Sequence, residues 1–245
     1  MTTATSFSYA LVTGASGAIG RAVSRVLASL GHHVYVHSNR NLAAAKQMVG
    51  ELVSAGLRAS GVQFDVTDRP STESSLNALL EIAPIQILVN SAGVHDDAIF
   101  PGMSSQQWHS VIDVSLSGFF NVTQPLILPM ARTGFGRIIS ISSVAALAGN
   151  PGQVNYAAAK AAIHGASKSL ALELASRGIT VNVVAPGIIA SPMSAAAFSP
   201  EAIAKLVPMK RAGTPEEVAS LIAYLASKEA AYLSGQVISV NGAMY

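Results

Sequence analysis

Tyr156 and Lys160 are the residues whose types and spacing most directly suggest chemistry. They are four apart, in an alanine-rich stretch that favours a helix, so the phenol and the ammonium would share one helix face. A nearby cation lowers a tyrosine pKa from about 10, which would suit Tyr156 to exchange protons with an alcohol or a carbonyl. Ser143 follows the apolar run 138–141 and could hydrogen-bond the same substrate oxygen. Alone, the pair also fits a helix with one packed tyrosine and one solvated lysine.

A glycine-rich stretch near the start of the chain suggests a binding site for an anionic cofactor. Gly14, Gly17 and Gly20 lie between an apolar run and a helical stretch. In that context the glycines let the backbone approach a pyrophosphate, and the helix N-terminus supplies free N–H groups. A glycine-rich turn without a ligand is the alternative, because tight turns need glycine anyway.

The end of the second apolar run predicts the choice of cofactor. An acid there would bind the ribose hydroxyls of NAD, but this chain has Ser38, Asn39 and Arg40. Arg40 could pair with a 2′-phosphate, with hydrogen bonds from the other two side chains, which favours NADP(H). The alternative is a solvated Arg40. We interpret His37 as a loop hydrogen-bonder rather than a catalyst.

The elements that position these residues follow the pattern of βαβ units. Apolar runs of four to eight residues alternate with helical stretches along the chain, which predicts a parallel sheet covered on both faces. We expect one doubly wound α/β domain over 1–245, with 187–210 as a mobile substrate-binding segment. Among the expected helices are 105–131, 153–177 and one that starts after Thr214. The predicted strands are Tyr9–Thr13, Val34–His37, Arg58–Phe64, Ile85–Asn90, Arg137–Ser142, Thr180–Ala185 and Gln236–Asn241.

The composition of the 245 residues narrows the function further. Half of them are hydrophobic and only 11% are charged, which is typical of a buried, oligomer-prone chain. A net charge of +2 without a basic run argues against nucleic-acid binding. We expect no signal peptide, no membrane span and a cytoplasmic location, and the absence of cysteine is compatible with that compartment. The dispersed histidines predict no metal site.

Taken together, these motifs resemble the short-chain dehydrogenase/reductase superfamily over nearly the whole chain. Beyond the glycine stretch and the tyrosine–lysine pair, the resemblance rests on Asp65, on 90–93, on Ser143 and on Pro186-Gly187. Within the superfamily the chain is similar to the 3-oxoacyl-[acyl-carrier-protein] reductases, notably in 155–169 and 234–245. That resemblance implies a Rossmann fold that binds a nicotinamide dinucleotide.

The resemblance also implies a role for each matching position. Ser143 would orient the substrate carbonyl, Tyr156 would donate the proton, and Lys160 would bind the nicotinamide ribose and depress the pKa of Tyr156. Tyr156, like Lys160, would also belong to the cofactor-binding set. For carrier docking, Arg177 matches one expected arginine, whereas the basic residues expected before the strand Arg137–Ser142 are thinned, with Arg132 nearby. The other positions would bind the cofactor: Gly14, Ser16, Gly17, Ile19 and Gly20 at the diphosphate, Asp65, Val66, Asn90, Ala92 and Gly93 at the adenosine end, and Pro186, Gly187, Ile189 and Ser191 at the nicotinamide end.

Ser115 is the main departure from the family pattern. The family usually has an asparagine there, which holds a water that connects the lysine to solvent. A serine hydroxyl can also bond a water, but it is shorter and lacks the amide. We therefore assign Ser115 to the catalytic set and expect the proton relay to persist through a rearranged water.

The resemblance implies NADPH-dependent reduction of an acyl-carrier-protein-bound 3-oxoacyl thioester, in fatty-acid or related polyene biosynthesis, by a homotetramer. Two alternatives stay open. The chain could act on another carbonyl or alcohol, such as an acyl-CoA or a small ketone, because specificity cannot be decoded from 187–210. It could also be a non-catalytic NADP-binding subunit, which Ser115 alone supports.

Overall fold

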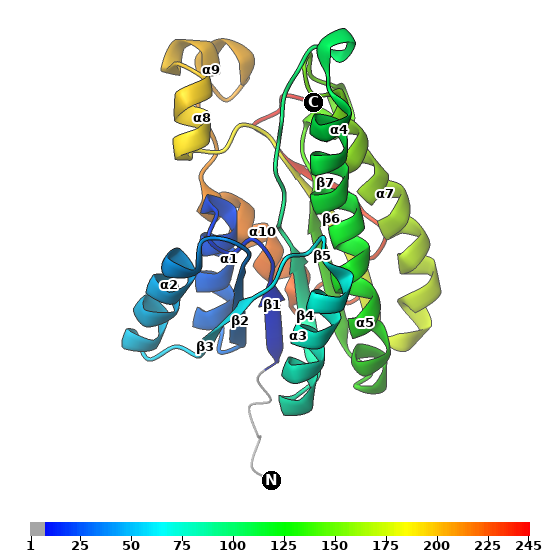
Figure 1. Cartoon of the computed structure of the whole chain (residues 1–245). Helices are drawn as coiled ribbons and strands as arrows, with labels where there is room; N and C mark the ends of the chain where they lie inside the picture. The colour runs from blue at the N-terminus through cyan, green and yellow to red at the C-terminus, as the bar shows by residue number, and fades with distance from the viewer. Residues whose placement is uncertain (1–7) are drawn as a thin grey trace.

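A single sheet of seven parallel strands forms the centre of the computed structural model, which describes residues 8–245 (Figure 1). The strand order is β3-β2-β1-β4-β5-β6-β7. Every predicted strand is present, and its ends differ from the prediction by no more than one residue. The strands are β1 (Tyr9–Val12), β2 (His33–Ser38), β3 (Ala59–Gln63), β4 (Ile85–Asn90), β5 (Gly136–Ile141), β6 (Ile179–Pro186) and β7 (Val237–Val240).

Helices bury both faces of this sheet, as the continuous apolar strands require. One core contains residues of α1 (Ala18–Ser29), α2 (Leu42–Ser54) and α10 (Pro215–Ala226). The other contains residues of α3 (Arg69–Ile82), α5 (Gly118–Arg132) and α7 (Val154–Leu174). Strand side chains alternate between them, with Val12 in the first core and Leu11 in the second. The predicted doubly wound α/β class is confirmed.

The order in which strands are added to the sheet reverses next to β1, and a crevice for a ligand is expected at that point. From β1 it builds β2 and β3 on one side, then crosses to β4 and continues to β7 on the other. The loops after β1 and β4 therefore diverge at the carboxyl ends of the strands, where open α/β sheets bind ligands. Above this edge stand α8 (Pro192–Ala197) and α9 (Pro200–Leu206), at the upper left of Figure 1.

The stretch predicted as one helix over 105–131 is interrupted. It consists of α4 (Ser105–Ile112), a π turn η2 (Asp113–Ser117) and α5, which stays α-helical through Pro125 and Pro129. The irregularity thus lies around Ser115 rather than at the prolines. By length and composition this helical stretch could cross a membrane, but here it covers the sheet, with Leu126 and Met130 fully buried.

Short segments complete the site's surroundings. The predicted helix over 153–177 is α7 followed by the 3₁₀ turn η3 (Ala175–Arg177), and α6 (Ala145–Ala148) precedes it. A second 3₁₀ turn, η1 (Phe100–Gly102), lies between β4 and α4. Thr214 caps α10 in a capping box with Glu217, as its sequence predicts.

Arg137 gives a stability prediction outside the site. This buried residue of β5 donates from Nε to the Ser227 carbonyl at 2.9 Å and from Nη1 to the Gly136 carbonyl at 2.8 Å. Arg137→Ala leaves a cavity and unpaired carbonyls, so we expect the free energy of unfolding in urea to fall by about 2–4 kcal/mol. The exposed Arg132→Ala should change it by less than about 0.5 kcal/mol. Equal effects of the two variants would contradict the buried role of Arg137.

Candidate active site

Ser143, Tyr156 and Lys160 meet at the carboxyl end of β5. Ser143 follows that strand, and α7 carries the other two on one face. The Lys160 Nζ donates to the Ile141 carbonyl at 2.9 Å and lies 5.7 Å from the centroid of the Tyr156 ring. Ser143 hydrogen-bonds Tyr156, while its Oγ accepts from the Ala145 N–H at 3.1 Å. The structure therefore brings together the three residues that the sequence singles out.

The electrostatics of this trio differ from the sequence expectation. Burial raises the pKa of Tyr156; the hydrogen bond with Ser143 works against that rise and the charge of Asp97 adds to it. Burial also lowers the pKa of Lys160 to about 8. The prediction of a lowered Tyr156 pKa is therefore wrong for this structure, because desolvation of the buried phenol is the largest effect. A tyrosine with a raised pKa stays protonated at neutral pH, which suits a proton donor.

Ser115 lies next to Lys160 inside the π turn. A Cβ added to Gly93 would lie 3.1 Å from Lys160 Nζ and 3.8 Å from Ser115 Oγ, so only a glycine leaves these two groups room. Ser115 is 3% exposed, and its Oγ has no hydrogen-bond partner among the described residues. A small cavity is lined by both side chains. An unpartnered buried hydroxyl beside an ammonium is a suitable place for one water.

Asn155 supports the trio and was missed in the sequence. This fully buried amide donates from Nδ2 to the carbonyls of Asp96 and Gln107, at 2.9 and 3.0 Å. Its Oδ1 accepts from the Tyr156 N–H at 2.8 Å. One side chain thereby fixes the start of α7 against the loop after β4 and against α4. An asparagine beside a tyrosine carries no sequence signal for such a role.

The glycine stretch forms the predicted turn between β1 and α1. Gly14 has φ +61°, and a Cβ there would lie 2.8 Å from the Cα of Ala92. Gly17 is the N-cap of α1 and offers no side-chain cap, so the first-turn N–H groups, including that of Ile19, face outward without a helical partner. Ser16 is partly buried on the same turn. Gly20 needs its missing side chain, because a Cβ would lie 2.5 Å from the Gly14 carbonyl oxygen.

Thr13 joins this turn to the loop after β4. Its Oγ1 accepts from the N–H groups of Ser91 and Ala92, both at 3.0 Å. Asn90 points instead into the core, where its Nδ2 donates to Thr123 Oγ1 at 3.0 Å. Thr13 is a second supporting residue that was missed, because a threonine after a strand is common.

Polar side chains gather at the predicted adenosine end. Ser38 is buried, and its Oγ has no hydrogen-bond partner among the described residues. Asp65 Oδ1 accepts from the N–H and hydroxyl of Thr67. Burial raises the Asp65 pKa, but hydrogen bonds from Thr67 and Asn39 and the charge of Arg40 hold it below its usual value. Beside them, Val66 packs against the start of α5, where a Cβ on Gly118 would lie 2.8 Å from it.

The loop after β6 contains the predicted nicotinamide-end residues. Pro186 ends the strand, and Gly187 lies so close to Asn241 that a Cβ would come within 2.8 Å of its Cα. Ile189 is buried and forms an isolated parallel β-bridge with Gly213. Ser191 is the N-cap of α8, where its Oγ accepts from the Ser194 N–H at 3.1 Å.

Arg132 and Arg177 lie away from the site. Both are exposed near the amino ends of the strands: Arg132 is the last residue of α5, before β5, and Arg177 lies in η3, before β6. Leu174, the last residue of α7, comes 18 positions after Tyr156, which is about 27 Å of helix. The two arginines therefore do not border the cleft of their own chain.

The residues present fit a dinucleotide. The cradle of Gly14, Gly17 and Gly20, the free N–H groups of α1 and the orphaned Ser38 hydroxyl line one continuous edge of the sheet. In residues 8–245, no group of three or more histidine, aspartate or glutamate side chains could hold a metal ion.

Comparison with known proteins decides the family. The family model described as short chain dehydrogenase matches residues 8–202. The chain belongs to the short-chain dehydrogenase family. Short-chain dehydrogenases are oxidoreductases that use a nicotinamide cofactor, which agrees with the cradle and the trio described above.

Several known proteins are similar to this chain over almost their whole length. Nodulation protein G of Rhizobium sp. (strain N33) is 45% identical over 96% of each chain. The 3-oxoacyl-[acyl-carrier-protein] reductase of Synechocystis is 42% identical over 99% of this chain and 98% of its own. The 3-oxoacyl-[acyl-carrier-protein] reductase FabG of Escherichia coli (strain K12) is 43% identical over 96% of each.

Proposed function

We propose that this protein reduces a 3-oxoacyl thioester, carried by an acyl carrier protein, to the 3-hydroxyacyl thioester with NADPH, in fatty-acid or related polyene biosynthesis. The observation that carries the proposal is the hydrogen-bonded pair of Ser143 and Tyr156, with the phenol kept protonated by burial. Relatives named 3-oxoacyl-[acyl-carrier-protein] reductase support the substrate class.

The trio supplies the proton and holds the carbonyl. NADPH, when bound, supplies the hydride that adds to C3 of the thioester. Ser143 accepts from a backbone N–H and bonds Tyr156 in the free protein; when substrate is bound, its hydroxyl hydrogen would turn to the C3 oxygen, where negative charge develops. Tyr156 gives its phenolic proton to that oxygen, so the product is the 3-hydroxy group. The ammonium of Lys160 stabilises the phenolate that remains, and Ser115 would hold the water through which the proton returns.

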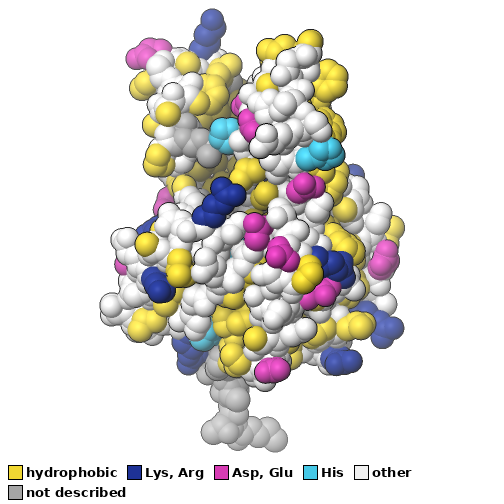
Figure 2. Space-filling view, in the orientation of Figure 1, with side chains coloured by type: hydrophobic (Ala, Val, Ile, Leu, Met, Phe, Trp, Pro, Cys, Tyr) yellow, Lys and Arg dark blue, Asp and Glu magenta, His cyan; other side chains and the backbone are white. Residues whose placement is uncertain are grey.

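The lips of the cleft suit an apolar chain. Figure 2 shows the molecule hollowed between the lobe of α8 and α9 and the opposite lobe around α4. Ile99 and Phe100, in the segment before α4, are 66% and 62% exposed, and Leu206 and Met209, at the end of α9 and after it, are also exposed. Singly exposed apolar side chains are ordinary, and in this proposal the acyl chain would contact apolar side chains of the two lobes. The proposal keeps 187–210 as a mobile segment that closes over the substrate.

Arg40 supports NADPH over NADH. Arg40→Ala removes a charge-assisted partner of the 2′-phosphate, so we expect the KM for NADPH to rise about 10-fold or more while that for NADH stays unchanged. Steady-state kinetics with both cofactors measure this, with Lys46→Ala, an exposed cation on α2, as the control. An unchanged preference in Arg40→Ala would contradict the assignment.

Ser115 supports the proton relay. Ser115→Ala removes the buried hydroxyl beside Lys160, and we expect kcat to fall about 10-fold with the KM for NADPH unchanged, because proton supply slows. Ser117→Ala, in the same π turn, is the matched control and should retain the rate. Wild-type kcat in Ser115→Ala would remove Ser115 from the catalytic set.

The proposal includes a homotetramer in the cytoplasm. Exposed apolar side chains on the helices of one sheet face support association: Phe120 and Leu128 on α5 are 51% and 69% exposed, and Leu172 on α7 is 85% exposed. Because Arg132 and Arg177 lie at the far edge of their own chain, they would dock a carrier protein only at the cleft of a neighbouring copy. A monomer at micromolar concentration in light scattering would contradict this part.

The function is tested by following NADPH oxidation with 3-oxobutanoyl thioesters of acyl carrier protein and of coenzyme A. We expect oxidation with both thioesters, faster with the carrier-bound one, and little oxidation of NADH. If a small ketone is reduced faster than either thioester, the result would favour the alternative function, a reductase of another carbonyl substrate. No oxidation of NADPH with any 3-oxoacyl thioester would contradict the proposal.

A further inference from the structure

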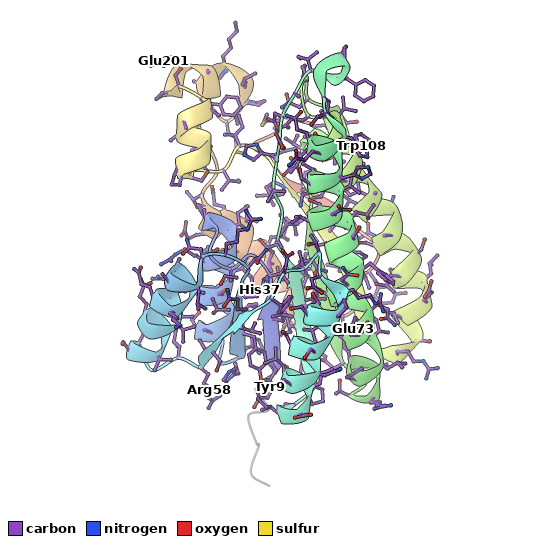
Figure 3. The ribbon with its side chains drawn as sticks, in the orientation of Figure 1. Tyr9, His37, Arg58, Glu73, Trp108 and Glu201 are labelled. Carbon is purple, nitrogen blue, oxygen red and sulfur yellow. The ribbon has the colours of Figure 1, made fainter. Side chains whose placement is uncertain are left out.

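His37 lies where β1 passes into α1 at the upper edge of the sheet, and both of its ring nitrogens are hydrogen-bonded (Figure 3). It is the penultimate residue of β2 and is 1% exposed. Its Nδ1 lies 3.2 Å from the Gly14 nitrogen, and its Nε2 lies 2.9 Å from the Phe64 carbonyl oxygen. The ring also packs on the Phe64 ring, with centroids 4.0 Å apart.

The two partners fix the form of the ring. A backbone N–H can only donate and a carbonyl can only accept, so Nδ1 must be the acceptor and Nε2 must carry the hydrogen. The neutral Nε2–H tautomer is the one form that satisfies both bonds. Burial lowers the pKa of His37 to about 4, although the bond to Phe64 and the charge of Asp65 oppose this, so the ring stays neutral at physiological pH.

The backbone carbonyl of His37 binds the next residue of the glycine turn, Ala15. The His37 carbonyl accepts from the Ala15 N–H at 2.9 Å. His37 therefore accepts hydrogen bonds from two consecutive N–H groups of the turn, at the point where Gly14 has the left-handed φ of +61°. The next N–H groups, at the start of α1, remain free to meet an anion.

We infer that His37 is a positioning residue of the cofactor site. Its ring holds Gly14 in the conformation that aims the first turn of α1 at the diphosphate, and its bond to Phe64 ties that turn to Asp65 at the adenosine end. This inference rests on the nicotinamide dinucleotide that the family uses. It does not depend on which thioester is reduced.

Two isosteric variants separate the two ring bonds. In His37→Asn the side-chain Oδ1 occupies the place of Nδ1, so the Gly14 N–H keeps its acceptor and the Phe64 bond is lost. In His37→Gln the amide N–H reaches Phe64, but the Gly14 N–H is left without an acceptor. Each variant loses one buried hydrogen bond, so the two are matched controls for overall stability.

Titration of the protein with NADPH, followed by the fluorescence of the bound nucleotide, measures Kd without turnover. We expect His37→Asn to bind within about 3-fold of wild type and His37→Gln to bind 10- to 100-fold more weakly, since a buried donor is left unpaired. At saturating NADPH, His37→Gln should retain wild-type kcat, and thermal unfolding should place the two variants within a few degrees of each other. A two-bond ¹H–¹⁵N spectrum of the wild type should show His37 as the Nε2–H tautomer.

Wild-type affinity in His37→Gln, or equal weakening in both variants, would overturn the inference, and so would an Nδ1–H tautomer. A wild-type protein that binds neither NADPH nor NADH would overturn the proposed function as well. If the wild type binds NADPH tightly and the two variants bind it with equal affinity, only the positioning role of His37 is contradicted.

Discussion

Replacing Tyr156 with phenylalanine is expected to lower kcat for 3-oxoacyl thioester reduction by about 10³- to 10⁴-fold, because the proton donor and one hydrogen bond to the developing oxyanion are lost together. The ring remains, so packing in the cleft is preserved. NADPH binding should change by less than about 3-fold, because Gly14, Gly17 and Gly20, the proposed diphosphate cradle, lie in the β1–α1 turn and the start of α1 rather than on α7.

The matched control is Tyr232→Phe. Tyr232 is fully exposed, so removing its hydroxyl should leave both kcat and the NADPH Kd unchanged. Rapid-mixing kinetics at saturating NADPH separate chemistry from binding. A Tyr156→Phe protein with more than a tenth of wild-type kcat would mean that another group donates the proton.

Replacing Lys160 with methionine is expected to remove at least about 100-fold of the activity and yet to leave the fold intact or more stable. The ammonium is buried at 3% exposure and bonds only the Ile141 carbonyl among the described groups. Its pKa of about 8, below the ordinary 10.5, shows that the folded state disfavours its charge. An apolar isostere removes that cost while it also removes the cation that stabilises the Tyr156 phenolate.

The stability cost of the buried Lys160 ammonium should depend on pH in a direction that follows from its lowered pKa. Between about pH 8 and pH 10.5 the unfolded chain holds a proton on Lys160 that the folded chain releases, so the free energy of unfolding rises with pH. The full rise is about 3 kcal/mol, and below pH 8 the whole penalty is present. In Lys160→Met this rise should vanish. The control is Lys168→Met, which replaces an exposed lysine two turns along α7, and in that variant the rise should persist. A parallel pH profile for all three proteins would contradict the buried charge.

The strands could be predicted from the sequence because each is an apolar run buried on both faces. β4, β5 and β6 are almost wholly buried, and a run of that kind has no other place in an α/β protein. The start of α10 was equally clear, since Thr214, Pro215 and Glu217 each favour a helix N-terminus for a local reason.

The residues that support the site could not be predicted, because their partners are far away in the sequence. His37 binds Gly14 and Phe64, 23 and 27 residues away, and Asn155 binds Gln107, 48 residues away. A short polar side chain in an apolar setting gives no sign of which backbone group it will meet. The direction of the Tyr156 pKa was wrong for a related reason, since spacing shows the nearby cation but not the burial that opposes it.

The π turn at Ser115 shows a third limit. Helix propensity predicts a helix over this stretch, but the register of its hydrogen bonds depends on how closely it packs. Gly118 lets the helix approach Val66, and Asn121 donates to the Val66 carbonyl at 2.9 Å. Single π turns are rare and often lie at functional sites, which agrees with the contact between this turn and Lys160.

The most direct test is to follow the transferred hydride in the presence and in the absence of the Tyr156 hydroxyl. The protein would be mixed with NADPH carrying deuterium at the reactive carbon of the nicotinamide ring and with a carrier-bound 3-oxobutanoyl thioester, and the product would be analysed by mass spectrometry. We predict a 3-hydroxybutanoyl thioester one mass unit heavier from the wild type and almost none from Tyr156→Phe. Deuterated product formed at equal rates by both proteins would contradict the assignment of Tyr156 as the proton donor.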